Sequence, residues 1–70
     1  MLKLKSEVTG TVWKVLVNPG QAVQADEVLI IVESMKMEIP IAAERAGQVS
    51  EVFVAEGEPV AEDQVVIHLE

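Results

Sequence analysis

The chain has 70 residues, with 5 Lys and Arg against 12 Asp and Glu, one His and no Cys. This length predicts one domain near the lower size limit for independent folding. The lack of Cys excludes a disulfide scaffold and thiolate metal sites, and a single His excludes a His cluster that binds a metal. A net charge of −7 argues against nucleic acid or an anionic membrane as partner, because both are bound through Lys and Arg.

The apolar residues are distributed in short runs. They make up 50% of the chain, yet the longest uninterrupted run, Val28 to Val32, has five residues. A membrane-spanning helix needs about 20. The first residues, 1–5, lack the apolar region of a signal peptide. We therefore expect a cytoplasmic protein.

The order of apolar residues predicts an all-β fold. Val, Ile and Leu dominate, and Gly or Pro interrupts the pattern at short intervals, as is typical of a barrel or sandwich. The segment Asn18 to Gly20 predicts a turn in which Gly20 is left-handed. Strands are expected over residues 2–8, 11–17, 27–33, 38–43, 48–54 and 64–69.

An internal repeat is the strongest feature of the sequence. When the chain is shifted by 37 positions, residues 10–33 align with residues 47–70 without a gap, and ten of the 24 pairs are identical. Paired glycines are hard to obtain by chance from composition alone. We interpret four of them as structural turn residues: Gly10, Gly20, Gly47 and Gly57.

The repeat predicts geometry as well as composition. Two units, 2–33 and 39–70, flank a linker at 34–38. If a two-fold axis relates the units, the two chain ends lie close together and far from the linker. The apolar alternation also slips at equivalent places, which predicts a bulge or sharp bend used twice. These places are Val12 to Val15 and Val49 to Val52.

Lys36 stands at the centre of the linker, between Met35 and Met37. A short exposed turn favours Gly, Asn or Asp, whereas exposed Met is a soft and adaptable contact surface. An ordinary surface lysine is the simpler interpretation, but it leaves both the flanking Met and the midpoint position unexplained. We therefore expect Lys36 to project from a hairpin tip as a functional residue.

The segment Glu33 to Glu38 resembles the biotin attachment motif, whose core is Met-Lys-Met. Glycine-bounded runs over 10–20 and 47–57 resemble the motif's usual context in biotinyl domains of biotin carboxyl carrier proteins and carboxylases. Small single-domain biotin/lipoyl attachment proteins are the most similar members. The resemblance implies one attachment domain over 1–70 with the hammerhead fold: a flattened barrel of two four-stranded antiparallel sheets with pseudo-two-fold symmetry.

The resemblance also implies a function. Lys36 would receive covalent biotin from a biotin protein ligase, and the biotin would carry a carboxyl group between biotin carboxylase and carboxyltransferase sites. The chain would be a non-catalytic carrier, monomeric in isolation. The ligase and partners would contact the residues around the lysine: Glu33, Ser34, Met35, Met37 and Glu38. Two alternatives stay open, in which the Met side chains pack onto the barrel and Glu33 has a structural role at a strand end.

Three other functions compete with this one. A lipoyl carrier, or an acceptor of both groups, would share the fold and the Glu three residues before the lysine, but its usual motif is Asp-Lys-Ala. A stand-alone enzyme has little support in a chain without Cys or a phosphate-binding loop. A plain interaction module leaves Lys36 unexplained. We expect Trp13 to lie in the core, and His68 to face solvent from a strand without a catalytic role.

Overall fold

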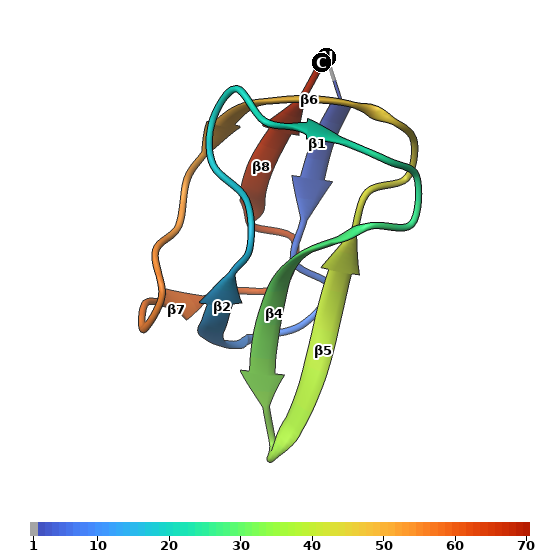
Figure 1. The fold of residues 1–70 in the computed structure, drawn as a ribbon. Coiled ribbons are helices and arrows are strands. Elements are labelled where there is room, and N and C mark those ends of the chain that lie inside the picture. Colours follow the sequence, from blue (N-terminus) through green and yellow to red (C-terminus); the bar gives the residue numbers. More distant parts are fainter. Residues whose placement is uncertain (1) are drawn as a thin grey trace.

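The computed structural model describes residues 2–70, and that part of the chain forms eight β-strands and no helix (Figure 1). All six strands expected from the apolar pattern are present, with shifted ends. Two further strands of two residues each were not expected from that pattern. The strands are β1 (Leu2–Lys5), β2 (Gly10–Val15), β3 (Ala22–Val23), β4 (Val28–Ser34), β5 (Met37–Ala42), β6 (Gly47–Val52), β7 (Pro59–Val60) and β8 (Val65–Leu69).

The strands form two four-stranded antiparallel sheets, which confirms the expected fold class. One sheet has the order β1-β8-β6-β3 and the other β5-β4-β2-β7. Each strand of one sheet has its repeat counterpart at the same place in the other. Backbone hydrogen bonds from the turns before β3 and β7 to the neighbouring strand repeat as well. The Gly20 N–H donates to the Val49 carbonyl at 2.7 Å, and the Gly57 N–H donates to the Val12 carbonyl at 2.8 Å. The structure therefore has the predicted two-fold symmetry.

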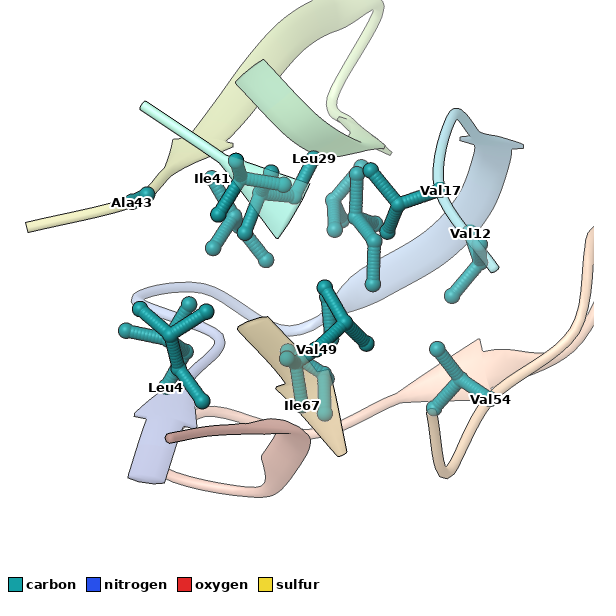
Figure 2. Packing of buried hydrophobic residues seen from close by; sticks show 14 of the residues in the cluster. Leu4, Val12, Val17, Leu29, Ile41, Ala43, Val49, Val54 and Ile67 are labelled. Carbon is teal, nitrogen blue, oxygen red and sulfur yellow. The ribbon is translucent and has the colours of Figure 1, made fainter. Parts of the chain in front are cut away.

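The hydrophobic core lies between the two sheets and consists of aliphatic side chains. Figure 2 shows Leu29 and Ile41 of one sheet facing Val49 and Ile67 of the other. Burial of one such side chain stabilises the fold by roughly 1.5–3 kcal/mol. The shared core therefore fixes the two sheets against each other and gives the β4–β5 hairpin a rigid base.

Both predicted bulges are present. The pairing register shifts between Val12 and Lys14 in β2, and between Val49 and Glu51 in β6. A bulge adds one residue to a strand and redirects the side chains around it. Trp13 is the extra residue of the first bulge, and its side chain is 43% exposed. The expectation that Trp13 lies in the core is therefore wrong.

The paired glycines have two different roles. Gly20 and Gly57 lie in turns with a φ of 91°, a conformation that favours glycine. Gly10 and Gly47 instead begin strands β2 and β6, so their interpretation as turn residues is wrong. A Cβ atom on either residue would come within 2.3 Å of a backbone carbonyl oxygen. Glycine is needed there because the backbones approach closely.

The two ends of the described chain meet at one end of the molecule. Leu2 in β1 pairs with Leu69 in β8. Figure 1 shows the β4–β5 turn at the opposite end, as the repeat predicts. Within residues 2–70, no helix is long and apolar enough to cross a membrane.

Candidate functional site: the tip of the β4–β5 hairpin

The linker between the repeats forms a two-residue hairpin turn. Strand β4 ends at Ser34 and β5 begins at Met37, so Met35 and Lys36 alone make the turn. Their φ angles are 52° and 66°. Positive φ at both central residues is characteristic of a type I′ turn, whose twist matches that of the strands. The left-handed conformation costs a residue other than glycine roughly 1–2 kcal/mol, and such strain gathers at functional sites.

Side chains at this turn point into solvent. Met35 is 93% exposed, Met37 is 63% exposed, and Lys36 between them is exposed as well. The alternative in which both Met side chains pack onto the barrel is therefore wrong. Their thioethers form a soft apolar surface on both sides of the lysine amine. The Lys36 side chain is therefore accessible from solvent.

Two acidic residues flank the turn. Glu33 in β4 and Glu38 in β5 are directly opposite each other in the hairpin register, and both are exposed. Like charges in a cross-strand pair destabilise a hairpin. Glu33 also pairs with Thr11 of β2, whereas β5 is the edge strand of this sheet. Glu33 thus lies near the end of a strand, as the alternative of a structural role for this residue requires. The tip of the hairpin combines one amine with two nearby carboxylates.

The hairpin is tied to the barrel by a side-chain hydrogen bond. The Ser34 hydroxyl donates to the backbone carbonyl of Thr9 at 2.9 Å. The Thr9 hydroxyl in turn accepts from the backbone N–H of Glu62 at 3.1 Å. Sequence reasoning did not single out Thr9, because a backbone acceptor is not marked by residue type. The structure therefore gives Ser34 an anchoring contact in addition to its place beside the turn.

His68 lies on the other sheet, away from the hairpin. Its side chain is on the outer face of β8, at the register of Lys3 and Glu51. The ring is half-buried because Phe53 meets it edge-on, with 4.6 Å between the ring centroids. The structure thus agrees with an outward-facing strand position. The lack of a catalytic role stays a prediction.

Two hollows in the surface lie elsewhere on the barrel. One, of about 290 Å³, is lined by residues of β1 and β5 and the segments beside them. The other, of about 480 Å³, is lined by the segments around Val17 and Val54. Lys36 lines neither of them. The chemistry available at the tip is that of an exposed nucleophilic amine.

The chain is similar in sequence to known proteins. Residues 4–69 match the family model described as "Biotin-requiring enzyme". The chain is 44% identical to the biotin/lipoyl attachment protein of Bacillus subtilis over 63 residues, which cover 90% of this chain and 86% of that protein. It is also 44% identical to the biotin carboxyl carrier protein of Streptococcus mutans over 57 residues, covering 81% of this chain and 44% of the carrier.

Solved structures show the same arrangement. The urea carboxylase of Kluyveromyces lactis superposes with a TM-score of 0.92 at 32% identity, over 99% of this chain and 6% of the carboxylase. The lipoyl domain of the Azotobacter vinelandii 2-oxoglutarate dehydrogenase complex superposes with a TM-score of 0.85 at 26% identity, over 100% of this chain and 96% of that domain. Since the family match spans nearly all of its residues, the chain belongs to the biotin/lipoyl attachment domain family.

Proposed function

We propose that Lys36 is the covalent attachment residue and that its natural group is biotin, with residues 1–70 acting as a single attachment domain. The observation that carries this proposal is the exposed amine at the tip of a strained turn between two exposed Met side chains. The Met-Lys-Met sequence favours biotin over lipoate, because lipoyl domains usually have Asp-Lys-Ala.

In the chemical step of attachment, the reacting group of this chain is the Lys36 amine. A biotin protein ligase presents biotinyl-adenylate, and the Lys36 Nζ attacks its acyl carbon. The amide C–N bond forms, the bond between the acyl carbon and the phosphate oxygen breaks, and AMP leaves. Two protons go to solvent, one from the ammonium before it attacks and one from the nitrogen as the amide forms. The formal net charge changes from −7 to −8, because the ammonium charge is lost. The flexible four-carbon stem of lysine lets the amine reach the acyl group.

Once attached, biotin supplies a carrier for a carboxyl group between a biotin carboxylase site and a carboxyltransferase site. The chain itself contributes a rigid base and a tether, which raises the local concentration of the group at each site. In this proposal the chain has no catalytic residue of its own. The ligase and the partner enzymes contact Met35, Met37 and the residues beside them, Glu33, Ser34 and Glu38. Relatives named as carboxylases and carboxyl carriers support this role.

Lipoate is the second candidate, alone or together with biotin. The similarity to a lipoyl domain over the whole chain favours it, as does a relative named as a biotin/lipoyl attachment protein. Glu33 stands three residues before Lys36, as in lipoyl domains. The two groups are attached by different ligases, so they can be separated experimentally.

The test is co-expression with a biotin protein ligase or with a lipoate ligase, followed by intact mass measurement and streptavidin binding. Wild type should gain one biotin, and Lys36→Arg should gain none, because guanidinium stays protonated and is a poor nucleophile. Lys3→Arg is the matched control, since Lys3 is also exposed but lies on β1 of the other sheet. A lipoyl adduct alone would favour the second candidate. No adduct from either ligase would refute both.

A further inference from the structure

The two sheets differ in the residues on their outer faces. In the sheet that carries the hairpin, Val12 and Val32 point into the core, so the alternate residues point outward. Ile31 of β4 is one of these, and it pairs with Lys14 of β2. Trp13, the bulge residue, is on the same side, because its ring lies 5.6 Å from the Lys14 Nζ. We name Trp13, Lys14 and Ile31 the hairpin-sheet face.

The internal repeat supplies a comparison within one molecule. Each residue of the hairpin-sheet face has a counterpart 37 positions later, on the outer face of the other sheet. The counterparts of Trp13, Lys14 and Ile31 are Ser50, Glu51 and His68. The backbones at these positions share the same bulge and the same register. The fold therefore accepts polar residues at all three positions.

The apolar residues of this face are thus not needed for the fold. An indole left 43% exposed keeps apolar surface in water, which burial against a partner would remove. Pro40 and its counterpart Lys3 do not distinguish the two outer faces. Each lies on an edge strand, where Pro and Lys commonly prevent pairing with the strand of another molecule. The difference between the faces therefore rests on Trp13 and Ile31.

We propose that the hairpin-sheet face is a docking surface for the ligase that acylates Lys36. This inference rests on the proposed function, in which Lys36 is the attachment residue. The unmodified lysine has only its four-carbon stem, so an enzyme that acts on the amine must come into contact with the turn and the strands beneath it. Partners that act on the completed arm reach the group at its far end, so they need less contact with the strands beneath the turn. The ligase is therefore the partner that this surface fits best.

Trp13 and Lys36 are close enough for one partner protein to contact both. Trp13 lies beside the Val32–Ile31 part of β4, four to five residues from Lys36. At about 3.3 Å per residue this separation is roughly 13–17 Å. A standard interface buries about 800 Å² on each partner, or roughly 30 Å across, so it covers both the tip and Trp13.

The charged residues around this face predict which residues the ligase should present to it. Glu33 and Glu38 border it on the side of the tip, and Lys14 lies beside the indole. The ligase surface should therefore offer an apolar pocket for Trp13, basic residues opposite the two carboxylates, and an acidic residue near Lys14. An aromatic anchor of this kind is a common energetic centre of an interface.

The test compares two aromatic residues of equal exposure, one in β2 and the other directly after β6 of the other sheet. Trp13 and Phe53 are each 43% exposed. Initial rates of biotin attachment are measured with purified ligase over a range of concentrations of wild type, Trp13→Ser and Phe53→Ser. Trp13→Ser should lower kcat/KM about tenfold, mainly through KM, and Phe53→Ser should change it by less than about twofold. Ile31→His, which installs the counterpart residue, is a second variant and should also raise KM.

Thermal unfolding of each variant shows whether it is folded under the assay conditions. Equal effects of Trp13→Ser and Phe53→Ser, or unchanged KM in Trp13→Ser and Ile31→His, would overturn the docking surface while leaving Lys36 as the attachment residue. Failure of wild type to gain any group from either ligase would overturn the proposed function and this surface together. If wild type accepts only lipoate, the same comparison with the lipoate ligase decides the surface.

Discussion

Gly10→Ala perturbs the contact between the start of β2 and the end of β4. A Cβ atom on Gly10 would lie 2.3 Å from the Glu33 carbonyl oxygen and 3.1 Å from a Val32 methyl carbon. Real Cβ contacts essentially never fall below 3.0 Å, so the carbonyl would have to move by about 0.7 Å. Because that oxygen belongs to a strand backbone, it cannot rotate away as a flexible side chain could. We expect a loss of roughly 1–3 kcal/mol in the free energy of unfolding.

The loss should be visible in both stability and attachment. For a domain of this size, 1 kcal/mol shifts Tm by about 4–8 °C, so Tm should fall by roughly 5–20 °C. Glu33 lies three residues before Lys36, so a displaced carbonyl also shifts the hairpin that presents the amine. Gly47→Ala is the matched control, because its Cβ would lie at the same 2.3 Å from the Glu70 carbonyl oxygen at the other end of the molecule.

The assay combines thermal unfolding, followed by far-UV circular dichroism, with the rate of biotin attachment at a temperature where all three proteins are folded. Both variants should lose stability, and only Gly10→Ala should be modified more slowly than wild type. An unchanged Tm in Gly10→Ala would contradict the steric reasoning. Equal slowing in both variants would show that the strand contact does not control how the hairpin presents Lys36.

Two further changes test the hairpin itself. Met35→Asn should raise the free energy of unfolding by up to about 1 kcal/mol, because Asn adopts the left-handed conformation more readily than Met. The same change should slow biotin attachment if the ligase contacts Met35. Urea unfolding measures the first effect and intact mass the second. Ser34→Ala removes the hydrogen bond to the Thr9 carbonyl and should cost about 0.5–1.5 kcal/mol. Relative to wild type, hydrogen exchange should then accelerate more in the hairpin than in β8. An equal change in both segments would contradict an anchoring role.

The long strands and the place of the turn could be predicted from the sequence, because alternation and the repeat are local or periodic signals. The two-residue strands β3 and β7 could not, since a pair of residues carries no alternation. The apolar character of Trp13 predicts a core position. The repeat indicates a bulge beside it, but not which way the extra residue points.

The glycines show a second limit of sequence reasoning. Gly10 and Gly20 are each matched in the second unit, so the repeat alone could not separate their roles. Gly20 is required by its own φ angle, which is a local property. Gly10 is required by Glu33, which is distant in the sequence and is brought close only by the pairing of β2 with β4. The positive φ angles of Met35 and Lys36 are equally hard to foresee, because neither residue type favours them.

The repeat separates what the fold requires from what the site requires. Core positions and the two kinds of glycine recur in both units, because both sheets face the same packing problem. The Met-Lys-Met turn occurs once, since the end of the molecule opposite to it is where β1 and β8 meet. A core residue or glycine shared by the two units is thus explained by stability. Positions at which the units differ on equivalent backbone, such as Trp13 and Ser50, are where a partner of Lys36 would act.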